Sequence, residues 1–128
     1  MATINNFEEL EIWKTAIDLA VKTYKLADVE PLKSDFGMKD QIRRSVNSIS
    51  NNIAEGFEYG NNPDFIRLLT YAKGSTGEFR NQLIILNKVN KLETLYFNEL
   101  HNDTKLLGIK IGNFIKYLKT YKKKNRNP

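Results

Sequence analysis

The 128-residue chain contains no cysteine, and it has only three prolines, one histidine and one tryptophan. Without cysteine, disulfides, thiolate metal sites and cysteine nucleophiles are excluded, and nothing indicates an oxidising compartment. No apolar run approaches the roughly 20 residues that a membrane helix needs, and the N-terminus lacks the pattern of a signal peptide. The sequence therefore predicts one cytoplasmic domain without membrane contact, large enough to bury a core unaided.

Catalytic motifs are missing as well. The sequence contains no glycine-rich phosphate loop and no nucleophile elbow. Thr104 and Lys105 stand where a helical metal pair would need a second ligand for His101, which is expected to be an exposed side chain. Di-iron bundles use Glu-x-x-His motifs, whose absence argues against Glu55 and Glu78 as a metal or acid–base pair. The sequence predicts a non-enzymatic protein with no metal and no cofactor.

Four long segments carry a helical period, and breakers such as Pro31 and Pro63 separate them. Within each segment, apolar residues recur mostly at alternating steps of three and four. Short connections make sequential helices antiparallel, and a repeat averaging about 3.5 residues favours left-handed packing. The expected fold is all-α, an up-down-up-down antiparallel left-handed four-helix bundle. Its domain covers residues 1–122, with helices at about 7–29, 36–58, 63–91 and 95–122, and a basic disordered tail covers 123–128.

The second and third predicted helices each carry a polar stripe beside the apolar one. In a hairpin that turns near Gly60, residues whose numbers sum to roughly 122 lie level, which pairs Ser48 with Ser75. None of these side chains is a lysine and only a few are charged, which favours a semi-buried network over the alternative of two solvated faces. The predicted network consists of Gln41, Arg44, Ser48, Asn52, Glu55, Arg67, Tyr71, Ser75 and Glu78. Close helix approach is indicated by Gly74, Gly77, Gly108 and Gly112.

All of the net positive charge lies in the last fifth of the chain. Eight bases and no acid follow Asp103, whereas the first 103 residues hold 12 bases and 15 acids. Such asymmetry is typical of proteins that bind polyanions, although lysines on a terminal helix can also serve only solubility. Phe114 and Tyr121 fall on the apolar stripe, so they are not expected to stack on bases. The candidate nucleic-acid-binding residues are Lys105, Lys116, Lys119, Lys122, Lys123, Lys124 and Arg126.

Several short motifs together resemble a known family. They are Phe7-x-x-Leu10-x-x-Trp13-x-x-Ala16, Gln41-Ile42-Arg43-Arg44, Ser48-Ile49-x-x-Asn52-Ile53-Ala54-Glu55-Gly56 and Ala72-Lys73-Gly74-Ser75-x-x-Glu78. They are similar to the signature of the four-helix bundle proteins encoded in bacterial 23S ribosomal RNA intervening sequences. The chain departs from it at Ser50 and Asn51, where members often have Pro-Ala, so no proline kink is expected there.

The resemblance implies a homo-oligomer, commonly a pentameric ring of bundles, with a basic surface for nucleic acid. Relatives in diversity-generating retroelements are accessory partners of a reverse transcriptase. The sequence therefore supports two hypotheses, a module that binds RNA or DNA through its basic end, and a scaffold that binds a protein partner without contacting nucleic acid. Salt-dependent RNA binding separates them, because only the first depends on phosphate contacts.

Overall fold

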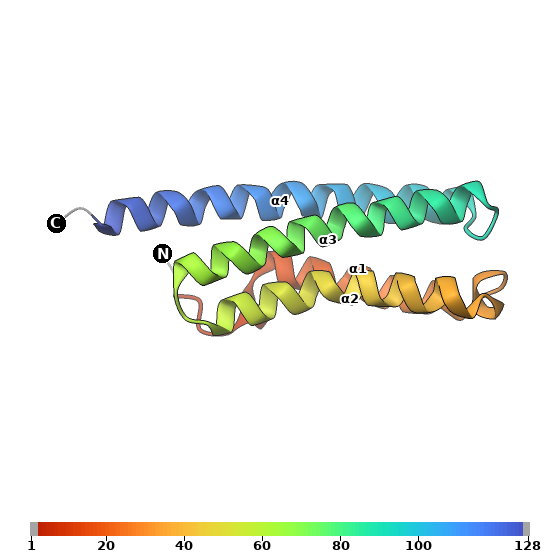
Figure 1. Ribbon diagram of the computed structural model, residues 1–128, viewed down its shortest axis with the longest axis horizontal. Coiled ribbons are helices and arrows are strands. Elements are labelled where there is room, and N and C mark those ends of the chain that lie inside the picture. Colours follow the sequence, from red (N-terminus) through yellow and green to blue (C-terminus); the bar gives the residue numbers. More distant parts are fainter. Residues whose placement is uncertain (1–2, 127–128) are drawn as a thin grey trace.

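The computed structural model describes residues 3–126, with side chains described from Thr3 to Tyr121. Four long α-helices and two short 3-10 helices make up the fold (Figure 1). They are η1 Phe7–Glu9, α1 Glu11–Ala27, η2 Leu32–Ser34, α2 Phe36–Glu58, α3 Asn62–Lys88 and α4 Thr94–Arg126. No strand occurs in the described residues, and the expected all-α class is confirmed.

The four helices lie side by side and alternate in direction, which is the expected up-down-up-down topology (Figure 1). Each helix packs on the next one along the chain, and α1 also packs on α4 to close the bundle. At the end where the N-terminus lies, α4 projects beyond the other helices (Figure 1). Within the described residues, none of the helices has the length and apolar character to cross a bilayer.

The apolar stripes of all four helices meet in one core. Ile49 and Ile53 of α2, Phe79 of α3 and Leu107 of α4 have no exposed surface. Each such side chain contributes about 1.5–3 kcal/mol relative to an exposed one. The second helix has the predicted bounds, and it continues through Ser50 without interruption. The core therefore holds the outer surfaces of α2, α3 and α4 in fixed register.

The bounds of the first and third helices differ from those predicted. Glu9 accepts hydrogen bonds from the backbone N–H groups of Asn5 and Asn6, and this capping box closes only the turn of η1. Leu10 is then extended, so α1 begins at Glu11. At the other end of the bundle α3 stops at Lys88.

The end of α3 has a specific backbone geometry. Asn90 adopts a left-handed conformation with φ of 61°, and the Lys91 N–H donates to the Leu86 carbonyl at 2.8 Å. This pattern is a Schellman cap, for which Asn is one of the few suitable residues after Gly. The sequence predicts a helix to residue 91 because its lysines and apolar residues all suit a helix. The cap ends it three residues earlier.

The fourth helix is longer than the sequence predicts. Its backbone is helical to Arg126, where the expected end is at about 122 and a disordered tail follows. Lysine and arginine are good helix formers, and no glycine or proline interrupts the segment before Pro128. The helical backbone therefore extends the basic segment beyond the N-terminal end of α1 (Figure 1).

Candidate nucleic-acid interface

The two acids of the fourth helix, Glu99 and Asp103, lie on the side that faces α1. On the side of α1, Lys22 Nζ lies 2.9 Å from a Glu99 carboxylate oxygen and 3.3 Å from one of Asp103. The hydrogen bond to Glu99, followed by the one to Asp103, raises the pKa of Lys22. Lys110 lines a small cavity on this same side. The acids near α4 are therefore directed away from α3.

A basic groove lies on the other side of α4, against α3. Three of the predicted residues, Lys105, Lys116 and Lys119, line it from α4. Lys73 and Arg80 line it from α3, and no carboxylate is among the described residues that line its volume of about 650 Å³. We call this feature the basic groove. It collects five cations from two helices in one concave surface.

Lys73 and Arg80 are not among the predicted binding residues. The prediction counted charge along the chain, and α3 as a whole carries acids as well as bases. The spacing of the residues in α3 places them on one helix face. Thr70, Lys73, Gly77 and Arg80 follow one another at steps of three, four and three. Which neighbour that face meets depends on the packing of α3 on α4, which the sequence does not give.

The glycines near the groove have different roles. A methyl group at Gly108 would lie 2.9 Å from Thr76 Oγ1, so this glycine permits close approach of α4 to α3. At Gly112 it would lie 3.5 Å from Cε of Lys73, which is ordinary contact. Gly74 and Gly77 have open space in the position of a side chain, so the close approach predicted for them does not occur.

His101 lies near two of the cations that line the groove, and they affect its pKa. His101 is half-buried against the Phe97 ring, with 5.1 Å between ring centroids, and is not the exposed side chain that the sequence predicts. Burial lowers the pKa of His101, and the charges of Arg80 and Lys105 lower it further. The Arg80 Nε is buried and has no hydrogen-bond partner among the described residues. Arg80 and Lys105 therefore place positive charge near His101.

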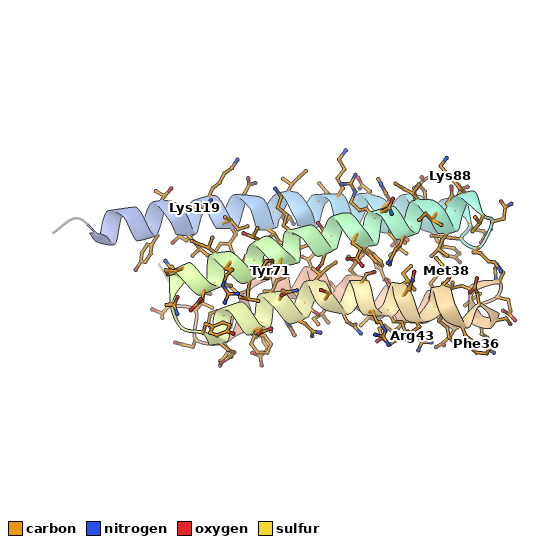
Figure 2. The ribbon with its side chains drawn as sticks, viewed as in Figure 1. Phe36, Met38, Arg43, Tyr71, Lys88 and Lys119 are labelled. Carbon is orange, nitrogen blue, oxygen red and sulfur yellow. The ribbon has the colours of Figure 1, made fainter. Side chains whose placement is uncertain are left out.

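The remaining predicted bases lie beyond the groove. Lys119 is exposed on α4, near the projecting end of that helix (Figure 2). The helical backbone continues from there through four more predicted residues, whose side chains lie outside the described residues: Lys122, Lys123, Lys124 and Arg126. The backbone therefore continues the basic segment along α4 past Lys119.

Hydrogen bonds join polar side chains at the centre of the α2–α3 hairpin. The hydroxyls of Ser48 and Ser75 are 2.8 Å apart, which is the level pairing that the sequence predicts. Asn52 Nδ2 donates to the Ser48 carbonyl at 2.8 Å, and Ser45 donates to Gln82 at 2.5 Å. These half-buried or buried groups fix the register of α2 against α3.

The ends of the predicted network are arranged differently. Arg44 donates to Asp40 at 2.9 Å and Arg67 to Asp64 at 3.3 Å, so each arginine is bonded within its own helix rather than to Glu78 or Glu55. Short i,i+3 and i,i+4 spacings form these pairs without any cost of bringing two helices together. Both glutamates and Gln41 are exposed. In the single chain, the polar face is therefore semi-buried only at its centre.

Arg67 forms a cluster with two tyrosines on this face. Its guanidinium carbon lies 5.9 Å from the centre of the Tyr59 ring and 6.0 Å from that of Tyr71. The two rings are 50% and 53% exposed, and Tyr71 lies on the side of α3 toward α2 (Figure 2). Arginine and tyrosine are among the residues most enriched in protein interfaces. This cluster gives the α2–α3 face the composition of a protein-binding surface.

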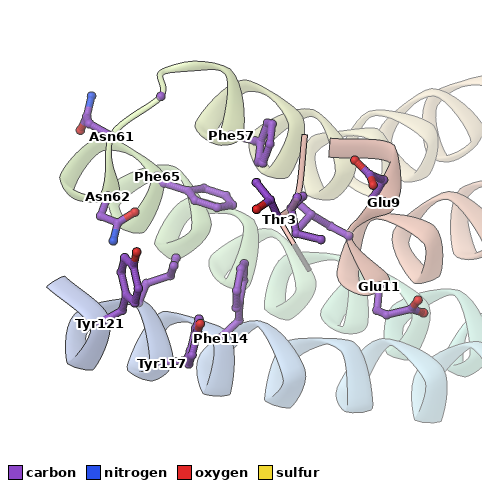
Figure 3. Close-up of a pocket in the computed structure, with 14 residues that line it drawn as sticks. Thr3, Glu9, Glu11, Phe57, Asn61, Asn62, Phe65, Phe114, Tyr117 and Tyr121 are labelled. Atoms are coloured by element: carbon purple, nitrogen blue, oxygen red, sulfur yellow. The ribbon is translucent and has the colours of Figure 1, made fainter. Parts of the chain in front are cut away.

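An aromatic cleft of about 950 Å³ opens at the end of the bundle where α4 projects. Figure 3 shows Phe57, Phe65 and Phe114 around it, with Tyr121 at its mouth. Tyr121, which the sequence places on the apolar stripe, is 48% exposed, and α1 begins only at Glu11. Glu9 and Glu11 also line the cleft, and this makes it less suited to a polyanion than the basic groove.

Comparison with known proteins gives one family and one fold. The family model described as 23S rRNA-intervening sequence protein matches residues 8–113. A crystal structure of a protein of unknown function from the S23 ribosomal protein family of Bacteroides thetaiotaomicron VPI-5482 superposes with a TM-score of 0.75. It is 26% identical and covers 82% of this chain and 98% of its own. No curated protein matches the chain. Neither description names an enzymatic activity.

Proposed function

We propose that this chain, which belongs to the 23S rRNA-intervening sequence protein family, binds nucleic acid without sequence specificity through the basic groove. The observation that carries the proposal is the gathering of five cations from α3 and α4 in one concave surface that no described carboxylate lines. A cleft lined by one sign of charge concentrates the field and attracts ions of the opposite sign. RNA and DNA both present such charge.

The expected binding is electrostatic. Lysines that contact phosphates displace condensed counterions, so affinity falls with salt by a slope of about 0.7–0.9 per contact in a plot of log affinity against log salt. Contacts of this kind position a nucleic acid but do not select a sequence. We include Lys122, Lys123, Lys124 and Arg126 in the proposed surface, because the helical backbone continues past Lys119 in their direction.

The test removes charge from the groove and from a matched surface. Replacing Lys105, Lys116 and Lys119 together by glutamine should weaken RNA and DNA alike and reduce the salt slope by roughly two. The control replaces Lys25, Lys33 and Lys39, which lie in α1, η2 and α2, and should change the slope little because none of them lines the groove. Filter binding at several salt concentrations measures both.

Two results would overturn the proposal. One is an unchanged affinity and slope in the groove variant. The other is an equal loss in the control variant, which would mean that only net charge matters. In either case the alternative of a scaffold for a protein partner, such as a reverse transcriptase, would become the better hypothesis.

We also propose self-association through the α2–α3 face. The observation that favours it is the exposed cluster of Arg67, Tyr59 and Tyr71. Large rigid aromatic rings supply contact area at low cost in conformational entropy, and tyrosine and arginine are both enriched among the residues that dominate interface energies. The basic groove lies on the other side of α3, so the two surfaces do not compete. The pentamer that the family resemblance implies stays a prediction.

A further inference from the structure

We infer that the basic groove takes one nucleic-acid strand, with its phosphate backbone against the helices, in preference to a duplex. The inference rests on the proposed function and specifies the ligand of the same site. Three features of the groove support it: its dimensions, the open positions along its floor, and the distribution of its polar groups.

The groove has the dimensions of a single strand. Lys105 and Lys119 are 14 positions apart on α4, which is about 21 Å along a helix axis. Packed helices have axes roughly 8–10 Å apart, so the depression between them is narrower than a nucleic-acid duplex. A duplex would touch only the outer lysines. A single strand can descend between α3 and α4 and meet Lys73 and Arg80 as well.

The floor of the groove is kept open by glycine. Gly77 lines it from α3, and the space where its side chain would stand is empty for 4 Å around. Gly112 lines it from α4, and the Lys73 side chain extends across toward it, since a methyl group there would lie 3.6 Å from Lys73 Nζ. Larger residues at these positions would fill the depression from which the Lys73 ammonium is reached.

Polar groups of both helices complement the cations. Asn113 lines the groove from α4, and its side-chain amide can donate to phosphate or sugar oxygens. Arg80 lines the groove from α3, and its planar guanidinium suits phosphate oxygens. No described aromatic side chain lines the groove, so bases are not expected to stack in it. A strand bound here would direct its backbone inward and its bases outward.

The decisive experiment fills the floor without changing any charge. Gly77→Leu places a bulky side chain in the groove, where open space lets the fold accept it. Gly74→Leu is the matched control, because its position is equally open but does not line the groove. Both substitutions should raise the midpoint of urea unfolding, since glycine is unfavourable inside a helix. Fluorescence anisotropy would then measure binding of a short oligouridine and of an RNA duplex of the same length.

The inference predicts that the wild-type protein binds the oligouridine more tightly than the duplex. Gly77→Leu should lose about tenfold or more in affinity for the oligouridine, equivalent to at least about 1.4 kcal/mol, while Gly74→Leu stays close to wild type. Equal affinities of the two glycine variants would overturn the inference, and so would a preference for duplex. The lysine variants test the proposed function separately. If that function is wrong, removing the groove lysines changes the affinity for neither the oligouridine nor the duplex.

Discussion

At the scale of single residues, Gly56 and Gly74 show why one glycine in a helix is required and another is not. A methyl group at Gly56 would lie 2.8 Å from Leu68 Cβ and 3.1 Å from Phe65 Cδ1, whereas nothing approaches Gly74 within 4 Å. Leu68 Cβ is fixed to the backbone of α3 and cannot move aside by a rotamer change. The close contact of α2 with α3 near their turn therefore depends on Gly56.

We predict opposite effects of alanine at these two positions. Gly56→Ala should lower the free energy of unfolding by about 1–3 kcal/mol, because the helices must separate to admit the methyl group. Gly74→Ala should raise it by roughly 0.5–1 kcal/mol, because alanine has the higher helix propensity. Urea unfolding followed by circular dichroism measures both. A stabilised Gly56→Ala variant would show that the hairpin is not closely packed there.

His101 is the residue from which the charge of the groove can be measured. Its pKa is lowered below the ordinary value of 6.5 by burial and by the charges of Arg80 and Lys105. The unfolded chain then binds a proton at higher pH than the folded chain, so the free energy of unfolding decreases as pH falls through about 6.5. As the chain has one histidine, its imidazole signals can be followed by NMR without assignment.

We predict that Arg80→Gln and bound oligouridine each raise the pKa of His101. The first removes a nearby positive charge, and the second adds phosphates that favour the protonated imidazole. Lys110→Gln is the control, because Lys110 lies on the α1 side of the helix and does not line the groove. A pKa that does not respond to saturating oligouridine would place the strand elsewhere on the protein.

At the scale of helices, the sequence predicts the existence and order of the helices from their apolar periodicity. It does not predict a helix end that depends on the conformation of one residue. The bounds of α2 agree with the structure because Asp35 caps its N-terminus and a glycine-containing turn follows. The end of α3 does not, because Asn90 alone sets the cap, and its left-handed conformation has no signature in the pattern of apolar residues.

The residues of the candidate site also divide into those that the sequence predicts and those that it does not. The lysines of α4 are predictable because they are close in sequence. Lys73 and Arg80 are not, since they join the groove only through the packing of α3 against α4. Likewise Ser48 meets Ser75 as the antiparallel register predicts, but the long side chains of Arg44 and Arg67 bond to acids one turn away on their own helices. Long charged side chains form hydrogen bonds within their own helix more readily than with a neighbouring helix, because the local bond orders fewer groups.

At the scale of the whole molecule, the two proposed surfaces lie on different sides of α3. The α2–α3 face holds Arg67 and Tyr71, and the basic groove lies between α3 and α4. Self-association through the first would leave the second open in every copy. Several grooves would then act on one RNA, and multivalent binding raises overall affinity without any new contact.

We therefore predict that the protein is a homo-oligomer whose dissociation weakens binding to long RNA. Light scattering at micromolar concentration should give a mass several times 14.8 kDa. The double variant Arg67→Ala with Tyr71→Ala should lower that mass, whereas Tyr96→Ala, a tyrosine of similar exposure on the α1 side of α4, should not. In the dissociated variant, affinity for a long RNA should fall by roughly 10²-fold or more while affinity for a short oligouridine stays unchanged, because only the long chain spans several grooves. A wild-type mass of one chain would contradict the prediction at its first step, and an equal loss for both RNAs would show that Arg67 and Tyr71 contact nucleic acid themselves.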